Sequence, residues 1–140
     1  MGFIIDTCIW INVERGNINP FDVKHYTKDE PVFLSPVTIA ELNFGIEIIK
    51  DQSIRQKRFV ALNRLKKKPS LFIDNTTGEI FGRIAAYLLN IGRGSDFRIQ
   101  DLWIASQAIQ YRMKLLTANE KDFKDIPGLD LVILKMEDIR

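Results

Sequence analysis

Three acidic residues stand inside otherwise apolar stretches of this sequence. Asp6 ends the run GFII near the N-terminus, Glu41 lies within SPVTIAELNFGIE, and Asp101 opens DLWIASQAI. Carboxylates exchange protons in general acid–base catalysis and are preferred ligands of hard divalent cations. If the three gather, each pair about 4 Å apart repels by roughly 4 kcal/mol at an effective dielectric of about 20, so the cluster needs a proton or a cation. The pattern therefore indicates a site for a divalent metal ion.

Each acid taken singly also has a purely structural explanation. Asp6 and Asp101 could cap helices, because Asp accepts hydrogen bonds from the free N–H groups of a first helical turn. Glu41 could pair with a buried arginine. These explanations account poorly for all three residues together. A Mg²⁺ or Mn²⁺ ion accounts for them at once and leaves coordination positions for water and a substrate phosphate.

The elements that must position these acids follow from apolar periodicity and from turn and cap residues. The expected strands are 2–6, 31–35, 71–74, 114–118 and 129–134. The expected helices are 7–16, one beginning near Asn19, 35–50, 51–68, one after residue 74 that runs to 91, 101–113 and a turn at 119–123, with a glycine-containing loop at 91–98. Strands that alternate with helices predict an α/β fold with three α/β/α layers and a mostly parallel sheet of four to five strands.

Two of the acids can be placed on this framework. In open parallel sheets ligands bind beyond the carboxyl ends of the strands, which is where Asp6 follows the first strand. Ala105 and Ala108 follow Asp101 by one and two helical turns, so the three residues share one face of the helix. The carboxylate of Asp101 should therefore lie at the top of a buried helix face.

The helix at 35–50 begins with Ser35 as N-cap and Pro36 in its first turn. We expect its core face to carry Val37, Ala40, Phe44 and Ile48, with Glu41 beside this stripe and turned toward the protein.

Composition restricts the class of protein. The chain has 140 residues, 46% hydrophobic and 27% charged, which predicts one globular domain over residues 1–140. One cysteine, Cys8, excludes an internal disulfide, and one histidine, His25, disfavours a histidine-based hydrolytic triad. Neither a signal peptide nor an apolar run of about 20 residues is evident, so we expect a cytoplasmic protein with no membrane association. The net charge of +2 says little about partners.

Four stretches resemble one known family, in that family's order and over almost the whole chain. They are IIDTCIW, SPVTIAELNFGIE, QDLWIASQAI and LLTANEKDFKDIPGLDLV. They are similar to PIN-domain ribonucleases, and specifically to VapC-type toxins of type II toxin–antitoxin systems. The resemblance implies a PIN-like fold and a hydrolase that cuts RNA phosphodiester bonds with Mg²⁺ or Mn²⁺.

The resemblance also assigns residues. Asp6, Glu41 and Asp101 fall on the family's catalytic positions, with Asp6 and Asp101 as metal ligands. An ion there would lower the pKa of a bound water, which Glu41 would position or deprotonate. Whether one or two ions bind stays open.

Further positions follow from the same alignment of motifs. Thr7 and Thr38 match hydroxyl residues of the family, Asn119 matches its fourth polar position, and Asp122 is a nearby additional candidate. Cys8 stands where relatives often have Asn or Ser.

Basic and aromatic residues supply candidate RNA contacts. Arg93 and Arg98 flank the loop before Asp101 and are the candidates for phosphate binding. The cluster from Arg55 to Lys68 is either a solvated helix face or a second RNA contact. Trp10 and Trp103 lie in apolar helical patterns, which favours core packing over base stacking.

The resemblance implies an RNA substrate, with tRNA among the candidates, a cognate antitoxin and a homodimer. Two alternatives stay open: a PIN nuclease of RNA processing without an antitoxin, and a non-catalytic RNA-binding PIN module. A phosphatase of the haloacid dehalogenase type is disfavoured, because its second Asp would stand where Cys8 is found.

Overall fold

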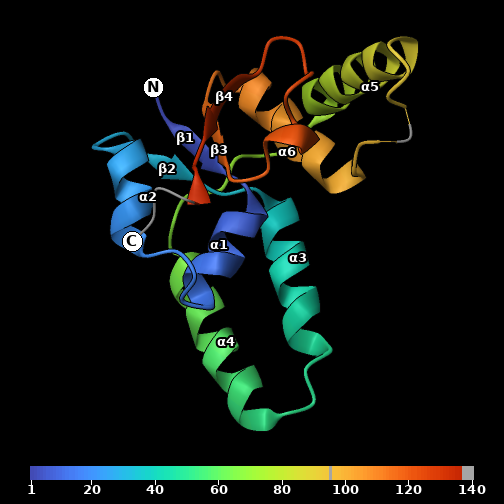
Figure 1. Ribbon diagram of the computed structural model, residues 1–140. Helices are drawn as coiled ribbons and strands as arrows, with labels where there is room; N and C mark the ends of the chain where they lie inside the picture. The colour runs from blue at the N-terminus through green and yellow to red at the C-terminus, as the bar shows by residue number, and fades with distance from the viewer. Residues whose placement is uncertain (95, 137–140) are drawn as a thin grey trace.

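The computed structural model describes residues 1–94 and 96–136 (Figure 1). Its strands are β1 (Phe3–Ile5), β2 (Val32–Phe33), β3 (Lys114–Thr117) and β4 (Asp130–Ile133). Its helices are α1 (Thr7–Glu14), α2 (Pro20–Thr27), α3 (Pro36–Glu47), α4 (Gln52–Leu65), α5 (Asn75–Asn90) and α6 (Ile99–Gln110), with a short 3₁₀ turn η1 (Glu120–Asp122). Ser95, in the predicted loop at 91–98, and residues 137–140 lie outside the described part.

The four strands form one sheet in the order β2-β1-β3-β4, and every pair is parallel. Phe3 lies opposite both Val32 and Lys114, so β1 is central although it opens the chain. The returns from β1 to β2 and from β2 to β3 therefore carry α-helices over the sheet, whereas the return from β3 to β4 contains only η1. The predicted parallel α/β sheet is confirmed.

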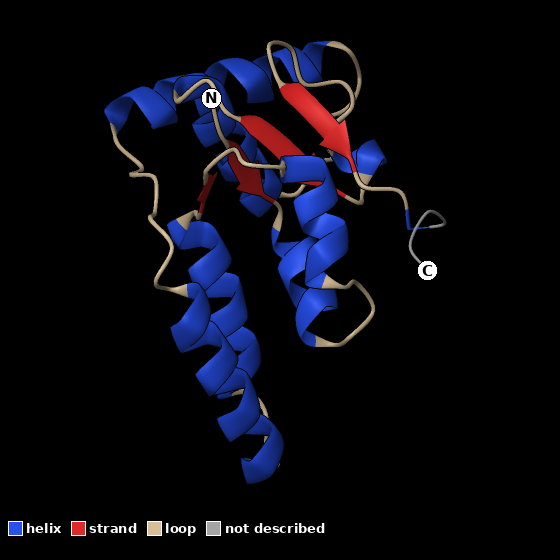
Figure 2. Ribbon diagram, turned by 90° about the vertical axis from the view of Figure 1, so that its left-hand side faces the viewer, coloured by secondary structure: helices blue, strands red, loops and turns tan. Residues whose placement is uncertain are grey.

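Helices cover both faces of this sheet, because successive side chains of a strand point to opposite sides. Phe3 and Ile5 pack with Ile9 of α1, whereas Ile4 packs on the other face with α5 and α6. Figure 2 shows the sheet between these groups of helices. The three-layer arrangement predicted from the sequence is therefore confirmed.

Local signals start the helices where the sequence places them. The side chain of Ser35 accepts the N–H of Val37 and Pro36 opens α3, while Asn19 caps α2 in the same way. In α5, the spacing of Ile80, Ile84 and Leu88 produces one buried face against α6. No helix in the described ranges combines the length and the apolar character that a membrane span requires.

The expected strand at 71–74 is wrong. Only Ser70 forms a bridge, with Leu34, and the Leu71 N–H donates to the Leu34 carbonyl at 2.8 Å. The chain of β2 leaves the sheet at Ser35 to begin α3, so residues beyond Leu71 have no strand to pair with. Phe72 is accordingly 78% exposed.

The expected core face of α3 is confirmed only at Val37, which packs against the core, and is wrong from Ala40 onward. Phe44 and Ile48 are 66% and 61% exposed, and the buried residues of α3 are Thr38 and Ile46. Figures 1 and 2 explain the difference, because α3 and α4 form a hairpin that extends away from the carboxyl edge of the sheet. Beyond its first turns, α3 has no sheet to cover and packs against α4.

Candidate active site

The first predicted acid lies where two neighbouring strands end. Asp6 directly follows β1, and its N–H donates to the Leu116 carbonyl of β3 at 2.9 Å. The residue is 4% exposed. It occupies the N-cap position of α1, yet its side chain makes no capping hydrogen bond. Helix capping therefore does not explain this carboxylate.

The Asp6 carboxylate is instead held from β3 and from α1. Its Oδ2 accepts a hydrogen bond from Thr117 Oγ1 at 2.8 Å and one from Cys8 Sγ at 3.0 Å. The Thr117 hydroxyl in turn accepts the backbone N–H of Asn119 at 3.0 Å. Sequence reasoning missed Thr117, although its place at the end of the strand that pairs with β1 was an available signal.

Glu41 projects from the second turn of α3 toward the same edge. Its Oε1 accepts the hydroxyl of Thr7 at 2.9 Å, and Thr7 also contacts the hydroxyl of Thr38 at 2.9 Å. Its Oε2 lies 3.3 Å from Nη2 of Arg98, a side chain that is 56% exposed. Glu41 is thus paired with an arginine at the surface of the site and not with a buried one.

Asp101 lies in the first turn of α6 and is 5% exposed. Ala105 and Ala108, on the same face, are fully buried as predicted. Within the described part of the chain, the buried Oδ2 of Asp101 has no hydrogen-bond partner. An unpartnered carboxylate oxygen in this environment is costly unless a proton or a cation reaches it.

The surroundings of Asp101 give it an unusual affinity for protons. Burial raises the pKa of Asp101 to about 7, and the negative charges of Asp6, Asp122 and Glu41 act in the same direction, against the opposing charge of Arg98. These causes show that the acids share one electrostatic environment, which Asp122 also reaches.

The two predicted phosphate contacts differ in placement. Arg98 is the N-cap residue of α6 and lies against Glu41. Arg93 instead pairs with Asp125 and donates to the Lys121 carbonyl at 3.1 Å. Its guanidinium ties the loop before α6 to η1 and to the segment that follows it.

The donor set fits a hard divalent cation. In residues 1–94 and 96–136, no three acidic, histidine or cysteine side chains converge closely enough to form a complete protein cage for a metal. Mg²⁺ does not require such a cage, because it is usually held by one or two carboxylates and keeps several waters. Asp6 and Asp101, one with an unpartnered oxygen, supply such a pair.

Comparison with known proteins agrees with this geometry. Residues 3–129 match the model of the PIN domain family. Ribonuclease VapC of Rickettsia bellii is 32% identical, over 99% of this chain and 100% of its own length. The chain belongs to the PIN-domain family, in its VapC-type branch.

Solved structures share the fold of this PIN domain. VapBC2 of Rickettsia felis, bound to a DNA fragment from its promoter, has a chain that superposes with a TM-score of 0.81 at 23% identity, over 96% of this chain and 100% of its own. VapBC-5 of Mycobacterium tuberculosis, a member of the VapBC family of toxin–antitoxin systems, gives 0.75 at 25% identity, over 96% and 98%.

We expect Asp101→Asn to stabilise the metal-free PIN domain, and by more at higher pH. An ordinary Asp has a pKa of 3.8, whereas Asp101 in the fold has about 7. Between these values the folded chain holds a proton that the unfolded chain has released, so stability falls as the pH rises toward 7 and the penalty is complete above it. The gain over wild type should be roughly 1–3 kcal/mol near pH 8 and small near pH 4.

Urea unfolding in EDTA across this pH range measures the difference between the two proteins. A gain that is the same at every pH would contradict the raised pKa of Asp101.

Proposed function

We propose that this PIN domain is a metal-dependent ribonuclease that hydrolyses RNA phosphodiester bonds, and that it is the toxin of a type II toxin–antitoxin pair. The observation that carries the proposal is the buried, unpartnered carboxylate oxygen of Asp101 in the shared field of Asp6 and Glu41. The ribonuclease name of the Rickettsia bellii relative supports the same activity.

In this proposal Asp6 and Asp101 hold a Mg²⁺ or Mn²⁺ ion at the carboxyl edge of the sheet. Such an ion, when bound, supplies positive charge to the phosphate and acidifies a water molecule. Glu41 positions the attacking water or accepts its proton, and its orientation is fixed by Thr7 on one oxygen and Arg98 on the other. No side-chain nucleophile is needed.

The other residues predicted to belong to the site have supporting roles in this proposal. Asp122 is the further carboxylate of the site, since its charge reaches Asp101. Asn119 contributes its backbone N–H to Thr117, and its side chain stays a predicted site group. Arg98, exposed beside Glu41, is the proposed phosphate contact. Arg93 is not, because its guanidinium is paired with Asp125. The substrate class is RNA, with tRNA among the candidates.

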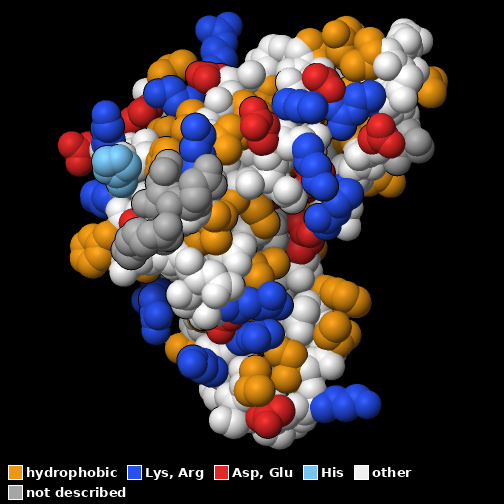
Figure 3. Space-filling model, in the orientation of Figure 1, with side chains coloured by type: hydrophobic (Ala, Val, Ile, Leu, Met, Phe, Trp, Pro, Cys, Tyr) orange, Lys and Arg blue, Asp and Glu red, His pale blue; other side chains and the backbone are white. Residues whose placement is uncertain are grey.

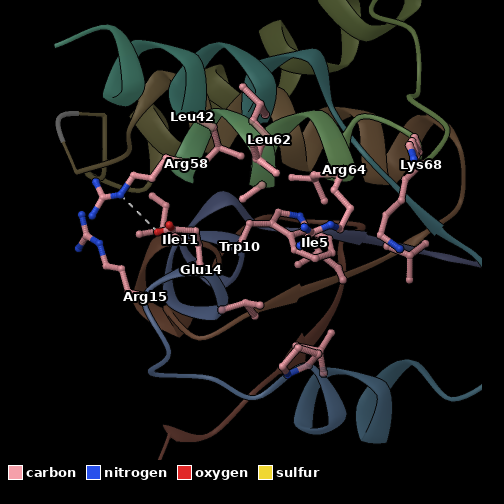
Figure 4. A pocket seen from close by; sticks show the side chains of 18 of the residues that line it. Ile5, Trp10, Ile11, Glu14, Arg15, Leu42, Arg58, Leu62, Arg64 and Lys68 are labelled. Carbon is pink, nitrogen blue, oxygen red and sulfur yellow. Dashed lines mark ion pairs between the residues drawn. The ribbon is translucent and has the colours of Figure 1, made fainter. Parts of the chain in front are cut away.

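A groove behind the site supports a protein partner. It lies between α1, α2, α3 and α4, has a volume of about 1390 Å³, and includes Glu41 in its lining. Figure 4 shows its apolar residues, with Trp10 beside Ile5 and Leu42 facing Leu62. Within the described ranges, the buried Nε1 of Trp10 has no acceptor.

The rim of this groove is basic. Several cationic side chains line it, among them four from the end of α1, from α4 and from the segment after α4: Arg15, Arg58, Arg64 and Lys68. Glu14 offsets part of this charge through its pair with Arg58 at 3.5 Å. In Figure 3, Lys and Arg side chains gather in the region where α1 and α4 meet.

We infer that the cognate antitoxin occupies this groove with an apolar segment flanked by acidic residues. An amphipathic segment laid in an apolar groove is a common recognition mode, and the basic rim selects its charge. An occupant that extends to Glu41 would block the site. This groove favours the toxin reading over a PIN nuclease without an antitoxin, and the intact acid cluster disfavours the non-catalytic alternative.

The homodimer expected from the resemblance has a candidate surface on α3. Phe44 and Ile48 are exposed there, and Figure 3 shows hydrophobic side chains along this helix. Exposed apolar patches on soluble proteins are commonly covered by a partner. We propose a second copy of the chain as that partner.

Neutralising one acid should abolish cleavage while the fold survives. Asp6→Asn or Asp101→Asn removes a proposed metal ligand, and Glu41→Gln removes the group that handles water, so each should lose at least about 100-fold in rate. Cleavage of a panel of structured RNAs that includes tRNAs, with Mg²⁺, Mn²⁺ or EDTA, measures this effect.

Asp130→Asn is the matched control, because Asp130 is exposed at the opposite edge of the sheet. Wild-type rates in the acid variants would refute the assignment.

Removing the charge of Arg98 should affect metal and RNA in opposite directions. In Arg98→Gln we expect several-fold tighter Mn²⁺ binding, because a cation beside the acids is lost. The same variant should bind RNA several-fold more weakly, because a phosphate contact is lost. Calorimetry with Mn²⁺ and filter binding of RNA to a cleavage-deficient background test the two effects. The control is Arg83→Gln, on the exposed side of α5. A change of the same sign in both affinities would contradict this role.

Charge reversal on the groove rim should separate inhibition from cleavage. Arg64→Glu should weaken binding of the antitoxin encoded beside this chain's gene at least tenfold, and more at low salt, while RNA cleavage by the free toxin is unchanged. Arg83→Glu, outside the groove, should bind like wild type. Equal affinity of wild type and Arg64→Glu would exclude the rim from the interface.

A further inference from the structure

The sole cysteine of the chain lies against the proposed metal site. Cys8 is in the first turn of α1, and its Sγ is 3.0 Å from Oδ2 of Asp6. The same oxygen receives the Thr117 hydroxyl at 2.8 Å. One oxygen of this carboxylate is therefore held by two side chains that come from different elements.

The direction of each hydrogen bond is fixed by the partners. The Thr117 hydroxyl accepts the Asn119 N–H, so its own hydrogen is free to go to Asp6. An ionised carboxylate has no hydrogen, so the Cys8 thiol must donate to it.

A second, independent feature points toward a ligand at this place. Asp101 is 5% exposed and its Oδ2 has no partner within the described residues. The charge of Asp6 is the second largest cause, after burial, of the raised pKa of Asp101. Two acids thus share a site in which Oδ2 of Asp6 accepts two hydrogen bonds and, among the described residues, Oδ2 of Asp101 accepts none.

We propose that Cys8 is a positioning residue for the metal ion: its thiol, with the Thr117 hydroxyl, holds Oδ2 of Asp6 so that Oδ1 is presented to the ion that Asp101 shares. This inference rests on the proposed function. Residues that orient a metal ligand usually change metal affinity by about 10–100-fold when they are removed. Serine preserves the donated hydrogen bond, whereas alanine removes it.

Calorimetric titration of the metal-free protein with Mn²⁺ tests the proposal without any substrate. We expect Cys8→Ala to weaken binding about tenfold, and Cys8→Ser to stay within about twofold of wild type. Ser106→Ala is the matched control, because it removes a buried hydroxyl of α6 that donates to the Leu102 carbonyl and is absent from the Asp6 network. Its Mn²⁺ affinity should equal that of wild type.

The S–H stretching vibration offers a readout that does not depend on metal. With one cysteine in the chain, this band reports Cys8 alone. We expect a frequency typical of a hydrogen-bonded thiol in wild type and of a free thiol in Asp6→Ala. This measurement also decides the matter if Cys8→Ala does not fold, since a free-thiol frequency in wild type would overturn the proposal.

The outcomes distinguish this inference from the function on which it rests. Wild type that binds no Mn²⁺ overturns the proposed function and the positioning role with it. Wild type and Cys8→Ala that bind Mn²⁺ equally overturn the positioning role and leave the proposed function standing. Loss of affinity in both Cys8→Ala and Cys8→Ser would show that sulfur volume matters and the hydrogen bond does not, which also overturns it.

Discussion

Repulsion among carboxylates at one edge of the sheet is the constraint around which this fold is built. Asp6 and Asp101 are almost fully buried, and Glu41 and Asp122 add negative charge to the same environment. Burying like charges costs free energy that the rest of the fold must offset. The compensation is visible in hydroxyl and thiol donors on Asp6 and in the guanidinium of Arg98 on Glu41. It is incomplete at Asp101, and this remaining deficit raises the affinity of Asp101 for a proton and is the basis of the cation site proposed above.

The parallel sheet makes such a concentration of charge possible. Because β1 and β3 are neighbours and run in the same direction, Asp6 and Thr117 emerge side by side at their carboxyl ends. The first turn of α6 presents Asp101 where the helix dipole favours a negative charge. The acids are thus fixed by rigid elements on both sides of the sheet edge, which is the preorganisation that electrostatic catalysis requires.

Charge is also separated on a larger scale. The net charge of +2 conceals an acidic site at the sheet edge and a basic rim around the groove between α1 and α4. The two regions meet at Glu41, which belongs to the acidic site and also lines the groove. A partner that binds the rim would therefore approach the acids, and any basic group that it carried would be attracted to them. The fold thus couples a surface suited to an acidic segment with a site suited to a cation.

The sequence by itself determined the local features of this protein. Strand and helix alternation, the caps at Asn19 and Ser35, and the placement of Asp6 and Asp101 at the starts of helices all depend on near neighbours in the chain, and each was predictable. The resemblance of four motifs identified the family on the same local basis. Tertiary structure decided what depends on distant neighbours. Residues 71–74 are not a strand because β2 ends before they could pair with it, and Phe44 is exposed because α3 extends past the sheet. Likewise Thr117 reaches Asp6, and Arg98 reaches Glu41 while Arg93 does not, because strand order and helix packing bring together side chains that periodicity cannot relate.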